Sequence, residues 1–146
     1  MKEIPLSRLL VLKLVKSTNM LKLRLTVPCD VIFVSCLLTN PLTGQSCIVD
    51  AVWDTGAQRT AISESACDCI GLKKGKPIEI EGSAGIAHGW ETKCNIAITE
   101  YDKWITKVDI LPQMPVHMVI GMDIISTGDL LLKHINNEYI FQFEQM

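Results

Sequence analysis

Short segments of extended character, separated by turn residues, constrain the fold of this chain more than any other feature of its sequence. Residues 21–27 (LKLRLTV) alternate apolar and polar side chains with a period of two, which is the pattern of a half-buried strand. Residues 31–38 and 46–53 are rich in apolar and β-branched side chains, and the turn residues of NPLTGQ (40–45) separate them. This arrangement predicts a β-hairpin in a mainly β domain.

The rest of the chain continues this pattern with one interruption. Ser63 can cap the start of a helix and Gly71 can end it, so we expect one short helix between them. Strand-like segments follow across residues 76–111, and a short helical turn is expected after Gly121. Residues 128–143 then predict two final strands around a turn at 134–137. Many short strands with one or two short helices favour an all-β fold, either a small closed β-barrel or a sandwich.

Size and charge exclude several classes of function. The 146 residues fit a single domain, 1–146, and a hydrophobic content of 48% is enough for a sizeable core. The formal net charge is -2 and no basic run occurs, so neither nucleic acid nor a membrane is expected as a partner. Arg8, Lys13 and Lys16 interrupt the apolar segment near the N-terminus, and no apolar stretch reaches membrane-spanning length. We therefore expect a cytoplasmic protein without a signal peptide.

The cysteines favour neither a disulfide framework nor a metal site. Without an export signal, they are better interpreted as small buried hydrophobic residues in a reducing compartment. Cys67-x-Cys69 could form half of a metal site, but the three histidines are isolated and no second ligand pair follows at finger-like spacing. We therefore expect no metal and no cofactor. The six cysteines are Cys29, Cys36, Cys47, Cys67, Cys69 and Cys94.

The stretch AVWDTGAQRTAIS (51–63) contains the candidate functional residue, Asp54. Asp-x-Gly is common turn chemistry, because Asp accepts a hydrogen bond from its own downstream backbone and Gly tolerates positive φ. On this tetrapeptide alone, Asp54 is as readily a turn residue as a catalyst. Two further features follow in order along the chain: a glycine-rich loop at 82–89 and an apolar step into glycine at Val119-Ile120-Gly121.

Together these features resemble the retropepsin-like aspartic proteases, the family of the retroviral proteases and their cellular and bacterial relatives. The specific part of the resemblance is DTGA after an apolar strand, then RTAIS and a short helix, and VIGMDII near the end of the chain. Counting strand order, the resemblance covers residues 21–143. It implies a small closed β-barrel of the retropepsin-like acid protease type and the hydrolysis of a peptide or protein substrate.

The chemistry of this class requires a second carboxyl group. One carboxylate activates a water, while a protonated carboxyl group donates to the carbonyl oxygen and later to the leaving nitrogen. Two Asp side chains about 3 Å apart share one proton and titrate as a pair. The chain contains one Asp-Thr-Gly, because STGD (126–129) has the wrong order and Asp123 follows its glycine. Asp54 would therefore pair with Asp54 of another copy across a two-fold axis, which predicts a homodimer.

The resemblance also assigns roles to the neighbours of Asp54. Thr55 would hold the two loops in register across the dimer axis, Gly56 would let substrate backbone approach closely, and Ala57 would leave room beside it. The step Val119-Ile120-Gly121 would pack beneath the Asp54 loop as its scaffold, although it could also simply end a core strand.

A flap that closes over substrate is expected at the glycine-rich hairpin tip, for which an ordinary surface loop is nearly as good an interpretation. The segment comprises Gly82, Ser83, Ala84, Gly85, Ile86, Ala87, His88 and Gly89.

Some positions depart from the commonest pattern of the family. Trp53 precedes Asp54 where a smaller aliphatic residue is usual, although a core role is its commonest use. Gln58 and Arg59 stand where retroviral members often carry acidic residues that bind substrate backbone. Residues 1–20 exceed the compact viral pattern and could form an extra strand, a dimerisation arm or a cleaved pro-segment.

Two other functions remain open at this point. The first is a non-catalytic β-barrel binding or assembly module with the same fold, since fold does not determine function. The second and weaker one is a phosphate-handling loop at DTGA, which lacks a Walker-type lysine motif and a helix directly after the glycine. Asp123 is expected to cap the short helix that follows it rather than to pair with Asp54.

Overall fold

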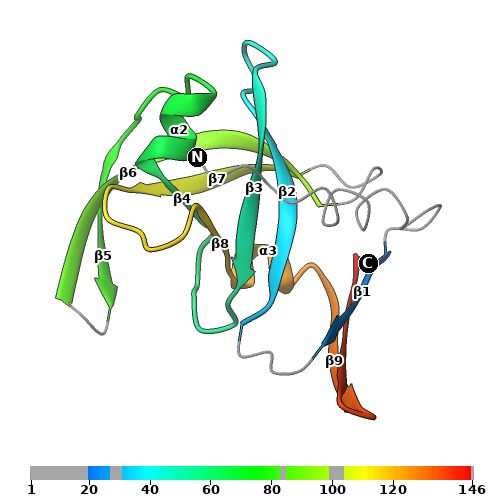
Figure 1. The fold of residues 1–146 in the computed structure, drawn as a ribbon. Helices are drawn as coiled ribbons and strands as arrows, with labels where there is room; N and C mark the ends of the chain where they lie inside the picture. The colour runs from blue at the N-terminus through cyan, green and yellow to red at the C-terminus, as the bar shows by residue number, and fades with distance from the viewer. Residues whose placement is uncertain (1–19, 27–30, 83–84, 99–103, 146) are drawn as a thin grey trace.

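The computed structural model describes residues 20–26, 31–82, 85–98 and 104–145, which form a mainly β fold with two short helices (Figure 1). The all-β expectation is confirmed. The expected arm, strand or pro-segment of residues 1–20 lies outside the described residues, except that Met20 begins the first strand. The helices are α2 (Glu64–Cys69) and α3 (Met122–Ile125), and the strands are β1 (Met20–Thr26), β2 (Phe33–Thr39), β3 (Ser46–Trp53), β4 (Ala61–Ser63), β5 (Pro77–Gly82), β6 (Gly85–Ala97), β7 (Trp104–Leu111), β8 (Met118–Ile120), β9 (Gly128–Ile135) and β10 (Glu138–Gln145).

The larger sheet closes on itself. Its strand order is β2-β3-β8-β4-β7-β6-β5, and an additional pairing of β2 with β6 completes a ring, as the sequence predicts for a closed sheet. The pairs β3–β8 and β4–β7 are parallel, and the other pairs of this sheet are antiparallel. Because β8 lies between β3 and β4, the chain must cross the end of β8 between residues 54 and 60. The order of the strands thus places the Asp54 segment against the Val119-Ile120-Gly121 step.

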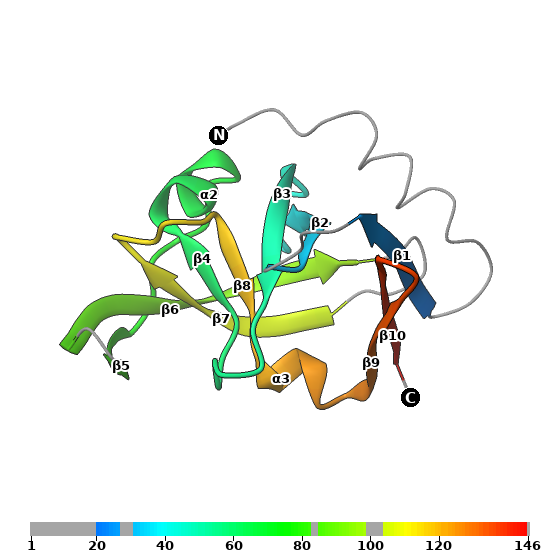
Figure 2. The same ribbon diagram turned by 60° about the horizontal axis from the view of Figure 1, so that its bottom comes forward.

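A second, three-stranded sheet of order β1-β10-β9 packs on the same core. In both ribbon views it lies on the opposite side of the molecule from the β5–β6 hairpin (Figures 1 and 2). Its buried aromatic residues meet Trp53, whose ring centroid lies 5.1 Å from that of Phe141 and 4.9 Å from that of Phe143. Trp53 is therefore a core residue that joins the two sheets, directly before Asp54. The strands of this sheet are predicted correctly, but not their separation from the closed sheet.

Local signals in the sequence place the predicted helix and the last turn. The hydroxyl of Ser63 accepts a hydrogen bond from the backbone N–H of Ala66 (3.1 Å), which is the predicted cap of α2, and Gly71 follows the helix with a φ of +65°. The turn between β9 and β10 is shorter than predicted. It consists of Asn136 and Asn137, whose φ angles are 51° and 60°. Two residues at positive φ match the twist of the flanking strands, so a two-residue turn is enough to close this hairpin. Neither helix found in the described ranges has the length and apolar character that a membrane crossing requires.

Candidate active site

Asp54 begins the loop that leaves β3, and its side chain is exposed. Its Oδ1 accepts a hydrogen bond from the backbone N–H of Gly56 (2.8 Å), and its carbonyl oxygen accepts one from the N–H of Ala57 (3.2 Å). This is the turn chemistry that Asp-x-Gly predicts. The turn and the catalytic interpretations are therefore compatible, since the turn presents the carboxylate at the surface, directly after Trp53, the buried last residue of β3.

Strand β8 lies directly beside this loop. Trp53 and Ile120 are partners in the parallel β3–β8 register, and the backbone N–H of Asp54 donates to the carbonyl of Ile120 (3.0 Å). Gly121 is buried, and a Cβ at this position would lie 2.7 Å from the carbonyl carbon of Arg59 and 2.9 Å from the carbonyl oxygen of Ala57. The structure thus brings the apolar step and the Asp54 loop into contact, at a distance that only glycine permits.

Helix α3 holds the second half of the loop. Its first two residues donate their backbone N–H groups to the loop, Met122 to the carbonyl of Ala57 (2.8 Å) and Asp123 to that of Gln58 (3.1 Å). These bonds satisfy N–H groups that a helix start leaves without intrahelical partners. The start of α3 therefore fixes the backbone of residues 57 and 58 through two hydrogen bonds.

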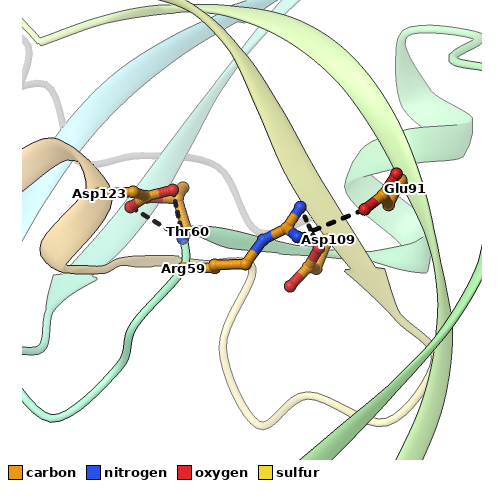
Figure 3. Close-up of polar contacts among 5 residues, drawn as sticks. All are labelled: Arg59, Thr60, Glu91, Asp109 and Asp123. Atoms are coloured by element: carbon orange, nitrogen blue, oxygen red, sulfur yellow. Dashed lines mark hydrogen bonds and ion pairs between the residues drawn. The ribbon is translucent and has the colours of Figure 1, made fainter.

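Asp123 fixes the end of the loop through Thr60 (Figure 3). The hydroxyl of Thr60 donates to Asp123 Oδ1 (2.7 Å), and the Thr60 N–H donates to Oδ1 (3.0 Å) and Oδ2 (2.9 Å). Thr60 Oγ1 in turn accepts from the N–H of Gly121 (3.1 Å). The prediction that Asp123 caps α3 is wrong, because Gly121 is the N-cap and Asp123 lies inside the first turn. From there its carboxylate accepts from Thr60 and from the N–H of Ile124 (3.0 Å).

The Arg59 side chain connects the loop to strands β7 and β6 of the closed sheet (Figure 3). Its Nη2 lies 2.8 Å from Oδ1 of Asp109 on β7, and its Nη1 lies 3.3 Å from Oε1 of Glu91 on β6. The Asp109 side chain is only 3% exposed. Its burial raises the pKa of Asp109, the Arg59 guanidinium opposes this rise, and the Glu91 and Asp123 carboxylates add to it. Arg59 thus provides the counter-charge for a buried acid.

Sequence reasoning missed this cluster, although it carried one usable signal. Asp109 interrupts an apolar segment (VDIL, 108–111), and a lone acidic residue on a buried strand requires a partner. Thr60 had no such signal, because a threonine at a strand start is unremarkable. The partner of each became visible only when β4, β7 and α3 were placed together.

The predicted flap is mostly strand. Residues 86–89 belong to β6, and the β5–β6 register extends to the pair Gly82 and Gly85, so the prediction of a loop across 82–89 is wrong. Ser83 and Ala84, which connect the two strands, lie outside the described residues. The hairpin itself is confirmed, because alternating strands pair across a short glycine-bearing connection. In both ribbon views its free end lies toward the same end of the molecule as the 54–60 loop (Figures 1 and 2).

The described cysteines are free thiols, and no group of three or more His, Cys, Asp or Glu residues within the described ranges could hold a metal ion. The expectation of burial is correct for Cys36, Cys67 and Cys94. It is wrong for Cys69, which is exposed at the end of α2, while Cys47 is half-buried. Cys29 lies outside the described residues.

Comparison with known proteins relates the chain to solved structures only. No family model and no curated protein sequence matches it. The structure of EIAV protease complexed with the inhibitor HBY-793 is similar, with a TM-score of 0.54 and 16% identity, over 68% of this chain and 89% of that chain. A retropepsin-like aspartic protease from Rickettsia conorii is similar with a TM-score of 0.55 and 14% identity, over 87% of this chain and 94% of that chain. At these identities the similarity establishes a shared fold.

Proposed function

We propose that this chain, which has the retropepsin-like fold, is an aspartic endopeptidase that acts as a homodimer. The observation that carries the proposal is the exposed carboxylate of Asp54, directly after the buried Trp53 that ends β3, on a loop that β8 and α3 hold in place. Since one fold supports many functions, the site and not the fold is the argument for catalysis.

The second carboxyl group is assigned to Asp54 of a second copy. Within the described residues, two nearby acids already have other partners, because Asp123 accepts from Thr60 and Asp109 pairs with Arg59. Among the residues that the structure describes, the Asp54 carboxylate accepts a hydrogen bond from the Gly56 N–H of its own turn. A two-fold axis through this loop would bring two identical carboxyl groups together, as an isologous interface requires.

The proposed reaction uses one shared proton. The ionised carboxylate takes a proton from water, whose oxygen attacks the peptide carbonyl carbon, while the protonated carboxyl group donates to the carbonyl oxygen. The tetrahedral intermediate then breaks its C–N bond, and the leaving nitrogen receives the proton that the first carboxylate had taken. As the C–N bond breaks and the product carbonyl forms, one hydroxyl of the intermediate returns a proton to the second carboxyl group. Both carboxyl groups thus return to their starting charge, and no cofactor is required.

Residues around Asp54 support this chemistry by position. A Cβ at Gly56 would lie 3.1 Å from Asp54 Oδ1, so a side chain there would crowd the carboxylate. Thr55 is exposed beside it and is proposed to contact the second copy. The β5–β6 hairpin is proposed as the flap that excludes water from the bound substrate.

The test is cleavage of a peptide library at mildly acidic and neutral pH, read by mass spectrometry. Asp54→Asn should lower cleavage by at least about 100-fold, the contribution typical of a general acid–base group, while sedimentation shows an unchanged dimer. Asp68→Asn, a matched change of an exposed residue on α2, should leave cleavage intact. Cleavage by Asp54→Asn at the wild-type rate would refute the proposal.

A mixing experiment tests the shared site separately. Excess Asp54→Asn protein, equilibrated with wild type, should lower activity per wild-type molecule, because most wild-type copies would then sit in mixed dimers with one carboxylate. Unchanged activity would contradict a site built from two copies. A stable dimer that cleaves no peptide would instead favour a binding or assembly module with this fold.

A further inference from the structure

Two cysteines meet at the end of the molecule away from the Asp54 loop. Cys47 lies on β3, just after the turn that connects it to β2, and Cys69 is the last residue of α2. In both ribbon views α2 and this end of the β2–β3 hairpin lie opposite the 54–60 loop (Figures 1 and 2). Any chemistry of this pair is therefore separate from the proposed active site.

Backbone and side-chain contacts hold these two segments together. The side-chain nitrogen of Asn40, a buried residue, donates to the carbonyl oxygens of Ile70 (3.0 Å) and Gly71 (3.1 Å). Gln45 Oε1 lies 3.0 Å from the place that a Cβ on Gly71 would take. The residues that flank Cys47 and Cys69 are thus in contact. Burial is the main cause of the raised pKa of Cys47, and the nearby Cys69 thiol adds to it.

The surroundings distinguish this pair from the other described cysteines. Cys36, Cys67 and Cys94 are buried, and their thiols donate to the carbonyls of Val34 (3.9 Å), Leu72 (3.3 Å) and Thr39 (3.6 Å) in that order. Burial raises the pKa of Cys47 to about 12 and that of Cys94 to about 11, so both are poor nucleophiles on their own. Cys69 is exposed and is the thiol of the pair that a soluble oxidant can reach.

We propose that Cys47 and Cys69 form a reversible intramolecular disulfide, a modification site on the face opposite the Asp54 loop. With a small disulfide such as oxidised glutathione, the Cys69 thiolate attacks one sulfur and releases one thiol molecule. Cys47 then loses its proton, attacks the Cys69 sulfur and expels the second thiol. Two protein thiols are oxidised to one S–S bond, and one small disulfide is reduced to two thiols.

The bond would close the chain segment 47–69, which contains the whole Asp54 loop. Closing a loop of this size restricts the unfolded chain, so the oxidised protein should melt at a temperature roughly 5–15 °C higher than the reduced protein. This inference does not depend on peptidase activity, and its test requires no substrate.

The test exposes the folded full-length chain to a redox buffer of reduced and oxidised glutathione, followed by alkylation and tandem mass spectrometry. We expect the loss of two alkylatable thiols and a linked peptide pair that joins Cys47 to Cys69. Cys47→Ser and Cys69→Ser should each abolish the link and the rise in melting temperature, whereas Cys94→Ser, the matched control beside Cys47, should retain both.

Three outcomes would overturn the proposal. They are a Cys47–Cys94 bond, glutathione that stays on Cys69 while Cys47 remains alkylatable, and two free thiols in the folded protein at every buffer ratio. Identification of the linked cysteines in the wild-type protein tests the proposal even if a serine variant folds poorly, because it uses no substitution.

Discussion

The carboxylate of Asp123 accepts hydrogen bonds from both the hydroxyl and the backbone N–H of Thr60, at 2.7 Å and 2.9–3.0 Å, across a sequence separation of 63 residues. Thr60 is the last residue before β4, and Asp123 is in the first turn of α3. This pair closes the loop that begins at Asp54, so the shape of the candidate site depends on a contact distant in sequence.

Asp123→Ala should destabilise the protein by about 2–3 kcal/mol, because hydrogen bonds to a charged acceptor are strong and the Thr60 N–H would lose its partner in a buried place. The free energy of unfolding in urea measures this effect. Asp68→Ala, an exposed position on α2, is the control and should change it by less than about 0.5 kcal/mol. An equal loss of unfolding free energy in both variants would show that the contact with Thr60 stabilises the protein no more than an exposed side chain does.

Gly121→Ala should destabilise the fold by about 1–3 kcal/mol or more, since the new Cβ would lie 2.7–2.9 Å from backbone atoms of Arg59 and Ala57, which cannot rotate away. Gly82→Ala is the control, because its Cβ would lie 3.9 Å from its nearest neighbour, the Gly85 carbonyl oxygen. Thermal melts followed by circular dichroism compare the two. Equal melting temperatures would contradict the close approach of β8 and the loop.

Arg59→Met should destabilise the protein more at neutral pH than near pH 4. Burial raises the pKa of Asp109 in the folded protein. The protonated side chain therefore stabilises the fold below the unfolded pKa of about 3.9. This stabilisation is lost as the pH rises through the folded pKa of Asp109. Removing the Arg59 charge raises that pKa further and leaves the ionised carboxylate without its counter-charge.

The expected loss at pH 7 is about 1–3 kcal/mol, less than for a fully buried pair because the Arg59 side chain is 42% exposed. Urea denaturation at both pH values measures it, and Lys93→Met, which removes an exposed cation on β6, serves as the comparison. A loss that is the same at both pH values would exclude the Asp109 charge as its cause.

Trp53→Ala should cost about 3–5 kcal/mol, because it removes the ring that packs on Phe141 and Phe143 between the two sheets. Trp53→Phe should cost less, since within the described part of the chain the buried Trp53 Nε1 has no hydrogen-bond partner to lose. Far-UV circular dichroism in urea follows unfolding without relying on tryptophan fluorescence. A phenylalanine variant as unstable as the alanine variant would contradict this ranking.

Much of the fold could be predicted from local patterns. The alternation in LKLRLTV identifies β1, Ser63 and Gly71 bracket α2, and the turn residues of NPLTGQ place the β2–β3 hairpin. These predictions succeed because side-chain periodicity, helix caps and turns depend on residues within a few positions of one another. The hairpin around Gly82 and Gly85 was found for the same reason, although its strands extend further than the glycine content suggests.

The candidate site was predicted only in part. DTGA and Val119-Ile120-Gly121 identify the loop and the strand that now lie in contact, and the Asp54–Gly56 hydrogen bond follows from the tetrapeptide. The buried ion pair of Arg59 and Asp109 was not foreseen, because these residues are 50 positions apart and their side chains meet only when β7 lies beside β4.

By itself, the sequence determined the strands, the cap of α2, the turn between β2 and β3 and the Asp-x-Gly turn, since each depends on local sterics and hydrogen bonding. Only the tertiary structure decided that β8 lies between β3 and β4, that Thr60 pairs with Asp123, and that Asn40 binds the segment directly after α2. Strand order and partner choice depend on which distant surfaces bury the most apolar area with every polar group satisfied. This free-energy balance depends on the whole chain, so strand order and residue partners cannot be predicted from any short segment.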